Sequence, residues 1–206
     1  MKVDPDQLRP AEVYRLMVGV ITPRPIAWVS TVSPRGITNL APFSFFNGVA
    51  ASPPTVVFCS ANRRDGSKKD TVVNIEATGA FVVNVVPYAL RETMNATSED
   101  LPYEASEIDR YGVTAVPSER VKPPRIGESP VQMECALHQI VRVGEGPLAA
   151  NVVIGRILLF HIDDRVLDPQ GPEARIDPRA LDTIGRMGGE GYARTTDLFF
   201  LPRPKG

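Results

Sequence analysis

The chain has 206 residues, of which 43% are hydrophobic and 23% charged, and its formal net charge is −1. This composition is typical of one globular domain over residues 1–206 and gives no chain-wide cationic surface for nucleic acid. With two cysteines and two histidines, a disulfide framework and a multi-histidine metal centre are nearly excluded, so we expect no metal site. The first ten residues lack an apolar signal region, and no apolar run approaches the ~20 residues of a bilayer span, so we expect a cytoplasmic protein without a membrane partner.

Short elements separated by turns are expected along the chain, because 20 Pro and 16 Gly are spread through it. The first third predicts a β-hairpin, in which a strand over residues 26–32 turns at Ser33-Pro34-Arg35-Gly36 and returns over residues 37–41. The later segments with strand character are residues 55–60, 81–86, 131–143 and 151–162. Short helices are expected at residues 70–78, 88–98 and near 104–111, the last within a Pro-rich excursion over residues 99–130, and a charged loop is expected at 165–178.

Residues 131–143 show the clearest alternation of apolar and polar side chains. The apolar face would carry Val131, Met133, Cys135, Leu137, Val141 and Val143, and the polar face Gln132, Glu134, His138 and Arg142. Residues 151–162 are the expected partner strand. Many strands, few helices and the absence of a β-α-β order predict a mainly β barrel or sandwich.

Familiar catalytic and nucleotide-binding motifs are absent. No G-x-G-x-x-G follows a strand, and Walker, H-E-x-x-H and G-x-S-x-G sequences are missing. His138 and His161 fit half-buried strand positions better than the role of base to a Ser or Cys nucleophile. We therefore assign no catalytic residue and expect a bound cofactor to carry the chemistry if the protein is an enzyme.

The densest basic cluster lies where the strand over residues 55–60 gives way to the helix over residues 70–78. It contains Arg63, Arg64, Lys68 and Lys69 beside neutral donors, and a helix N-terminus offers free N–H groups that suit a phosphate. Alternatively, Ser67 is the N-cap of a capping box and the cations form a solvated face. The residues alone leave both interpretations open.

A second candidate lies in the hairpin between Arg24 and Ser44. Trp28 and Phe43, followed by Phe45 and Phe46, are interleaved with hydroxyl and amide side chains. A flat heteroaromatic ring needs apolar walls and a few aimed donors. On the pattern alone, the simpler interpretation is that these aromatic residues belong to the core.

In order and context, these segments resemble the flavin reductase-like family of FMN-binding split barrels. The resemblance runs from about Met17 to Tyr192. Its motifs are T-P-R-P-I-A-W-V-S-T from Thr22, N-L-A-P-F-S-F-F from Asn39, Pro53-Pro54, K-D-T with N-I from Lys69, F-V-V-N from Phe81, Glu134-Cys135, and R-M-G-G from Arg186. No single motif is decisive, but their order is specific.

The resemblance implies a mainly β fold, a six-stranded antiparallel Greek-key split barrel with flanking short helices, and a homodimer that binds FMN near the subunit interface. The residues expected along the isoalloxazine ring and ribityl chain are Arg24, Trp28, Val29, Ser30, Thr31, Asn39, Ala41 and Ser44. The residues expected at the phosphate are Ser60, Ala61, Asn62, Arg63, Arg64, Lys69, Asp70 and Thr71. The resemblance does not decide which of Arg63, Arg64 and Lys68 points inward.

The implied activity is that of an FMN-dependent oxidoreductase that takes hydride from NAD(P)H and passes electrons onward, with the reduced flavin kept or released to a partner monooxygenase. Ser30, Asn39 and Ser44 are the expected donors to the reduced flavin. One alternative is a flavoredoxin-like electron-transfer protein without NAD(P)H activity of its own. Another is a flavin-free binding module that kept the barrel.

Overall fold

The computed structural model describes residues 1–168 and 175–204, so residues 169–174 of the expected charged loop lie outside the described residues. The main sheet is formed by β1 (Ala27–Val32), β2 (Thr38–Phe43), β3 (Phe46–Ala51), β4 (Pro54–Ala61), β5 (Ala80–Asn84), β8 (Val131–Val143) and β9 (Ala150–Ile162). Two small pairs join β6 (Ala115–Val116) to β7 (Arg125–Ile126), and β10 (Ile184–Arg186) to β11 (Tyr192–Arg194). The α-helices are α1 (Pro10–Val20), α2 (Asp70–Thr78), α3 (Arg91–Ala96), α4 (Glu107–Arg110) and α5 (Pro178–Leu181), with 3₁₀ turns η1 (Pro5–Gln7), η2 (Tyr88–Leu90) and η3 (Asp164–Val166).

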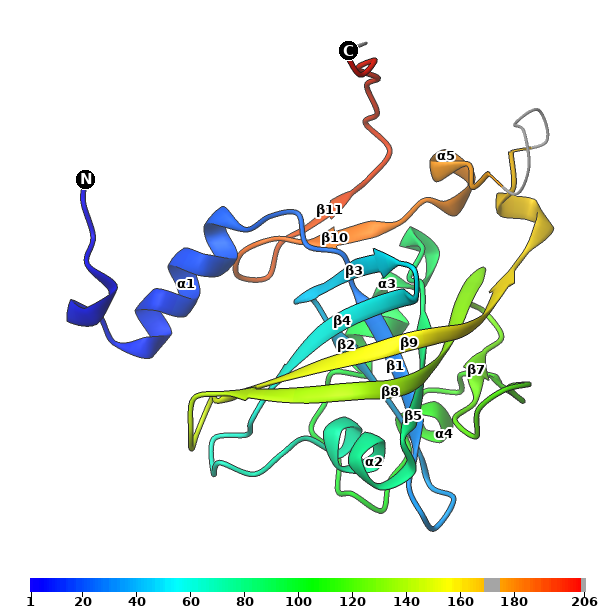
Figure 1. Cartoon of the computed structure of the whole chain (residues 1–206), viewed down its shortest axis with the longest axis horizontal. Coiled ribbons are helices and arrows are strands. Elements are labelled where there is room, and N and C mark those ends of the chain that lie inside the picture. Colours follow the sequence, from blue (N-terminus) through cyan, green and yellow to red (C-terminus); the bar gives the residue numbers. More distant parts are fainter. Residues whose placement is uncertain (169–174, 205–206) are drawn as a thin grey trace.

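The main sheet is antiparallel throughout and curls until its two edges meet. Its strand order is β2-β1-β5-β8-β9-β4-β3, so the edge strands β2 and β3 are consecutive in sequence. Only Ser44 and Phe45 separate them, and so short a link cannot span two distant edges. The backbone N–H of Cys59 in β4 donates to the carbonyl of Phe45 at 2.8 Å, which fastens this corner. The result is the split barrel seen in Figure 1.

Aromatic side chains fill the barrel interior. The ring centroids of Phe43 and Phe58 lie 4.9 Å apart, and those of Phe58 and Phe81 lie 5.5 Å apart. Gly155 on β9 leaves the room that Phe81 needs, because a Cβ at this position would come within 2.3 Å of the Phe81 ring. A second core cluster, which includes Trp28 and Leu40, packs against Met94 of α3 and Ile108 of α4.

The principal elements expected from the sequence are present. The hairpin of β1 and β2 pairs in antiparallel register, α2 has the expected bounds, and α4 lies within the excursion. The sheet has seven strands instead of six, because β3 was not expected; the Greek-key connectivity stays a prediction. The helix expected at residues 88–98 is divided into η2 and α3.

The expected alternation along β8 holds only in part. The side chains of its first five residues are all buried, because the excursion covers the face that would otherwise be polar. The register with β9 shifts twice: at Glu134/Cys135 the extra residue is Leu158 of β9, and at Leu137/Gln139 it is His138 of β8. An extra residue at a bulge reverses the faces beyond it. As a result, Val141 and Val143 are 39% and 58% exposed, and their placement on the core face was wrong.

Both ends of the chain extend from the barrel. In Figure 1, α1 projects to one side of the sheet and the C-terminal segment rises above it. Among residues 1–168 and 175–204, no helix is long and apolar enough to cross a membrane.

Candidate functional site

The basic loop does lead into the start of α2. Lys69 has extended backbone angles and is the N-cap residue, although its side chain makes no capping bond. The capping box with Ser67 as N-cap was therefore wrong: the Ser67 hydroxyl bonds to Asp65 at 2.6 Å instead. Helix geometry leaves the backbone N–H groups of Asp70 and Thr71 without intrahelical acceptors.

A small cavity, which we call the α2 cavity, lies at this helix start. It is lined by β2, the first turn of α2, the chain after α3 and α4, through Asn39, Ala41, Pro42, Arg63, Lys69, Asp70, Thr71, Thr97, Ser98, Glu99, Asp100, Leu101 and Glu107. The excursion, to which sequence reasoning gave no residue-level role, thus supplies Glu99, Asp100, Leu101 and Glu107. The α2 cavity has a volume of about 40 Å³, far below the several hundred Å³ of a site for a drug-sized ligand.

A chain of hydrogen bonds fixes the polar wall of the α2 cavity. The amide nitrogen of Asn39 donates to the hydroxyls of Thr31, at 3.2 Å, and Thr71, at 3.0 Å. The amide nitrogen of Asn74 also donates to the Thr31 hydroxyl, at 3.0 Å. Because an amide N–H cannot accept, the Thr71 hydroxyl keeps its own proton for donation to a ligand.

The four cations of the loop have different surroundings. Arg63 forms an ion pair with Asp70 at 2.8 Å and lines the α2 cavity. Lys68 points elsewhere, with its ammonium 2.6 Å from Glu76, and Arg64 is exposed. Lys69 is half-buried and lines the cavity, and its ammonium has no hydrogen bond or ion pair within the described part of the chain. Lys69 and Arg63 are therefore the cations of this site.

Four carboxylates also line the α2 cavity, and three of them are already compensated. Asp70 pairs with Arg63. Glu99 accepts bonds from Tyr111 and Arg110, and the Tyr111 hydroxyl lowers the pKa of Glu99 most. Glu107 accepts the backbone N–H of Leu40 at 2.9 Å, and burial raises its pKa. Asp100 completes the set.

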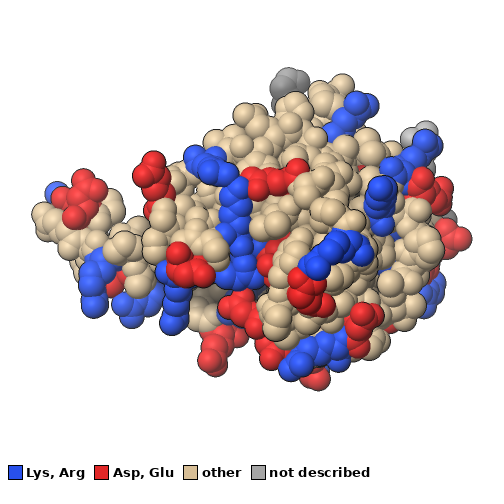
Figure 2. Space-filling view, turned by 90° about the horizontal axis from the view of Figure 1, so that it is seen from below, with Lys and Arg blue, Asp and Glu red and all other residues tan. Residues whose placement is uncertain are grey.

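The set of donors fits a phosphate group. Within residues 1–168 and 175–204, two backbone N–H groups, the Thr71 proton and the Lys69 ammonium have no acceptor at this helix start, and such groups bind oxyanions. Figure 2 shows Lys and Arg interspersed with Asp and Glu over one face of the molecule, without a broad cationic patch on that face.

The other residues expected at the phosphate do not line the α2 cavity. Ser60 is fully buried and its hydroxyl has no partner among the described residues. Asn62 is tied to the β8–β9 turn, because its amide donates to the carbonyl of Gly146 at 3.1 Å and accepts from Asn151 at 2.8 Å. Ala61 is exposed.

The residues expected around the flavin ring are mostly engaged inside the protein. Trp28 and Val29 are fully buried, and the Trp28 indole donates to the Thr97 hydroxyl at 2.9 Å. Ser30 donates to the carbonyl of Pro124 and accepts from Asn84. Of the ring-side set, Asn39 and Ala41 line the α2 cavity and Ser44 lines the groove beside it.

Arg24 is buried, and its side chain connects separate segments of the chain. Its guanidinium donates to the carbonyls of Val18, Ile21 and Met187 at 2.8–2.9 Å, and to the Ser44 hydroxyl at 3.3 Å. It thereby joins the end of α1 to the β10–β11 hairpin. Burial lowers its pKa, but arginine stays protonated in proteins.

A wider groove adjoins the α2 cavity, with which it shares Pro42 and Ser98. We call it the Arg186 groove; it has a volume of about 160 Å³ and is lined by Ile26, Pro42, Ser44, Met94, Asn95, Ser98, Arg186 and Tyr192. The Arg186 guanidinium lies 4.4 Å from the centroid of the Tyr192 ring, and the Tyr192 hydroxyl donates to Asn95 at 3.0 Å. Sequence reasoning used Arg186 and Tyr192 for the resemblance but did not assign them to the site.

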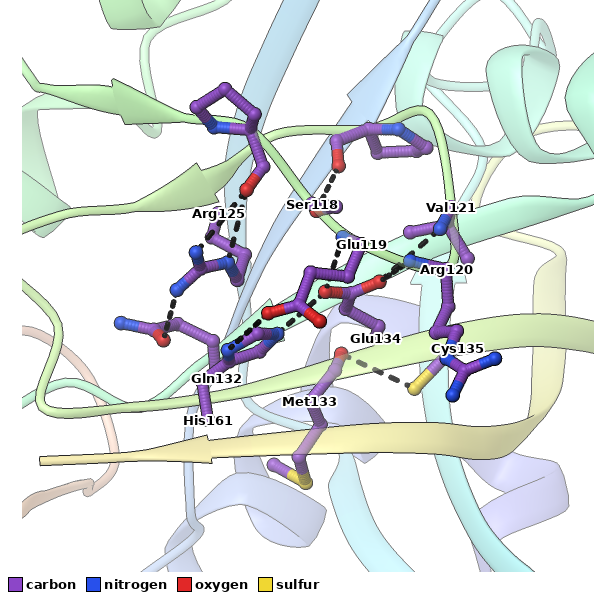
Figure 3. A network of polar contacts seen from close by, with 12 residues as sticks. Ser118, Glu119, Arg120, Val121, Arg125, Gln132, Met133, Glu134, Cys135 and His161 are labelled. Atoms are coloured by element: carbon purple, nitrogen blue, oxygen red, sulfur yellow. Dashed lines mark hydrogen bonds and ion pairs between the residues drawn. The ribbon is translucent and has the colours of Figure 1, made fainter.

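A separate polar network lies under the excursion, on β8 and β9 (Figure 3). The fully buried Glu134 accepts backbone N–H groups from Glu119, Arg120 and Val121, at 2.9, 2.6 and 3.2 Å, and lies 2.6 Å from the ring nitrogen Nε2 of His161. We call it the Glu134 network. It fastens the excursion to the barrel. No group of three or more His, Cys, Asp or Glu residues suited to a metal occurs in the part of the chain that the structure describes.

Comparisons with known proteins agree with this architecture. The family model of the flavin reductase like domain matches residues 19–175. An uncharacterized protein of Halalkalibacterium halodurans is 39% identical over 99% of this chain and 97% of its own length. The chain is also similar to the crystal structure of nitrilotriacetate monooxygenase component B from Bacillus cereus, with 33% identity, 98% of both chains covered and a TM-score of 0.91.

Two further structures show how widely the fold is used. For 2-nitrobenzoate 2-nitroreductase from Pseudomonas fluorescens the TM-score is 0.88 at 30% identity, with 99% of this chain and 96% of that chain covered. For flavoredoxin from Desulfovibrio vulgaris the TM-score is 0.75 at 19% identity, with 98% and 97% covered, a likeness of fold alone. By its match over residues 19–175 and by its split-barrel fold, the chain belongs to the flavin reductase-like family.

Proposed function

We propose that this protein binds FMN and works as an NAD(P)H-dependent oxidoreductase. The observation that carries the proposal is the set of unused donors at the start of α2: the Lys69 ammonium, the Thr71 hydroxyl proton and two backbone N–H groups. Donors gathered at a helix start favour an oxyanion, and a terminal phosphate supplies several acceptor oxygens.

The Arg186 groove is the proposed place for the ring, since it adjoins the α2 cavity at Pro42 and Ser98. Bound flavin supplies the redox chemistry, by accepting hydride and passing electrons onward. The chain's own residues bind and orient it: Lys69 and Thr71 hold the phosphate, while Ile26, Pro42 and Met94 provide apolar contact. The Ser44 hydroxyl accepts from Arg24 and keeps its proton for donation into the groove.

The partner proposed for the reduced flavin is a monooxygenase. The similar protein from Bacillus cereus is a monooxygenase component B, and that from Pseudomonas fluorescens is a nitroreductase. The first name is that of one component of a monooxygenase, and the second is that of a reductase of a nitro compound. We propose that the present chain likewise supplies electrons to a monooxygenase.

A second copy of this chain is the proposed partner of both termini. Tyr14, Met17 and Val20 of α1 are 55%, 43% and 78% exposed, and Phe199, Phe200 and Leu201 are 81%, 74% and 79% exposed. Apolar side chains in such numbers are characteristic of an interface. Light scattering of the purified protein should give the mass of a dimer; a monomer that binds FMN tightly would remove the interface from the proposal.

The absorption spectrum of the purified protein, followed by titration with FMN and then with NADH or NADPH, tests the function. A stoichiometric flavin spectrum that either nicotinamide bleaches under anaerobic conditions is the expected result. Bound flavin that neither nicotinamide reduces would contradict the reductase and favour an electron carrier. A colourless protein that takes up no FMN would reject the proposal.

A further inference from the structure

The α2 cavity and the Arg186 groove differ sharply in charge, although they share Pro42 and Ser98. Four carboxylates line the α2 cavity beside two cations. Among the described residues, no Asp or Glu lines the Arg186 groove, and Arg186 is the one charged residue of its lining. An uncompensated cation in a partly dry groove favours a ligand that carries or gains negative charge there.

Arg186 has a close counterpart in its own hairpin. Arg194 on β11 also stacks on a tyrosine, with its guanidinium 4.3 Å from the Tyr88 ring centroid. Arg194 is neutralised by a two-pronged ion pair with Asp182, at 2.6 and 2.7 Å. Arg186 donates only to the carbonyl of Gly189, at 2.6 Å, and forms no ion pair within the described part of the chain. Stacking therefore holds both side chains, but only Arg186 presents free charge to a groove.

A second positive charge lies behind the same groove. The buried Arg24 guanidinium is bound by carbonyls and by the Ser44 hydroxyl, and no carboxylate pairs with it among the described residues. Since Ser44 accepts from this cation, its O–H bond is polarised, and its proton is left to donate into the groove. Arg186 thus offers a positive charge to the Arg186 groove, and Ser44 offers it a hydrogen-bond donor.

From this arrangement we infer that Arg186, assisted by the Ser44 hydroxyl, stabilises the reduced form of the flavin over the oxidised form and so sets its reduction potential. The inference rests on the proposed function. When a dihydronicotinamide reduces the ring, its C–H bond breaks, and the hydrogen and both bonding electrons pass to the flavin. The nicotinamide becomes a pyridinium cation and the ring gains one negative charge, which the groove meets with Arg186.

The test uses FMN-loaded protein and measures both the midpoint potential of the flavin and its dissociation constant in the oxidised state. The variants are Arg186→Gln, Arg186→Lys and, as the matched control, Arg194→Gln. Arg186→Gln should lower the ratio of affinities for reduced and oxidised FMN at least tenfold, which is about 30 mV for a two-electron couple. Its affinity for oxidised FMN should change less than threefold. The midpoint potential of Arg186→Lys should lie closer to the wild-type value than that of Arg186→Gln, and the potential of Arg194→Gln should equal the wild-type value.

Each contrary result has a distinct meaning. Wild-type protein that binds no FMN overturns the proposed function and this inference together. Wild type that binds FMN, with an unchanged potential in Arg186→Gln, overturns the inference alone. An equal fall in Arg194→Gln overturns it as well, because the effect would then belong to the overall charge of the hairpin. Loss of oxidised FMN binding in both Arg186 variants also overturns the inference, because Arg186 would then bind the oxidised ring as well as the reduced ring.

Discussion

The Glu134 network and the α2 cavity are both polar clusters buried against the barrel, yet they differ in what remains unbound. In the Glu134 network, the carboxylate accepts three backbone N–H groups and contacts His161, so donors and acceptors satisfy one another inside the chain. In the α2 cavity, the Lys69 ammonium and the Thr71 proton find no acceptor among the residues that the structure describes. This difference is the reason for proposing the ligand site at the α2 cavity and not at the Glu134 network.

The largest expected effect falls on the Glu134 network. Glu134→Ala should lower the free energy of unfolding by about 3–5 kcal/mol, because three partly buried backbone N–H groups and His161 lose the buried carboxylate that they contact. Denaturant unfolding would measure this loss, and FMN titration should show an affinity within twofold of the wild type. A large loss of FMN affinity in a folded variant would break the distinction between the two clusters.

The pH dependence of this stability is set by the same contacts. Burial alone would raise the pKa of Glu134, but the backbone N–H groups of Glu119 and Arg120 and the bond with His161 outweigh it and lower the pKa below 4.5. A carboxylate with a lowered folded pKa stabilises the protein above its unfolded pKa and loses that contribution as pH falls through the folded value. The stability difference between wild type and Glu134→Ala should therefore be constant near neutral pH and shrink below about 4.5.

The second effect concerns FMN binding. The double variant Lys69→Ala, Thr71→Ala should weaken binding by about 2–4 kcal/mol, since each charge-assisted hydrogen bond contributes about 1.5–3 kcal/mol. Lys68→Ala is the matched control, because the adjacent lysine pairs with Glu76 instead. A fluorescence titration that gives the same FMN affinity for the double variant and the control would contradict the placement of the phosphate at the start of α2.

A smaller effect is expected at Glu107. Glu107→Gln keeps an acceptor for the Leu40 N–H and removes one negative charge from the α2 cavity, so FMN should bind more tightly by about 1 kcal/mol at neutral pH. Burial raises the pKa of Glu107 above 4.5, so wild-type Glu107 takes up a proton as pH falls, and the two affinities should converge. Titrations across pH would check this; a constant difference between wild type and variant would show that Glu107 does not titrate beside the ligand.

Local patterns predicted the elements that support the site, but not its walls. The turn at residues 33–36 and the β-branched strand before it predicted the β1–β2 hairpin, and the bounds of α2 followed from its apolar run. β3 was missed because its residues are mostly exposed and include Gly48, so no alternation marks it. The bulge in β8 was missed for a similar reason, since one extra residue leaves no local signal.

The site residues that sequence reasoning missed come from distant segments. Glu107 reaches the α2 cavity because α4 of the excursion packs against β2, and Thr97 reaches it because α3 packs against the same strand. Arg186 reaches its groove through a bridge between Arg24 and Arg186. Arg24 shows the converse, a residue whose type suggests more than its packing leaves available. As a cation inside a motif it was expected at the flavin, yet its guanidinium is used up by three carbonyls and a hydroxyl. Residue type predicts chemistry, and tertiary packing decides which groups remain available for it.

The smallest expected effect tests this last point directly. Arg64 belongs to the same basic cluster as Lys69, but it is exposed and does not line the α2 cavity. An exposed charge outside the cavity is screened by water and salt, so Arg64→Ala should change FMN affinity less than twofold at physiological ionic strength. Titration of Arg64→Ala beside Lys69→Ala separates two explanations of the cluster. Equal losses would mean that the loop attracts phosphate through its total charge; a loss confined to Lys69→Ala would mean that position within the cavity decides binding.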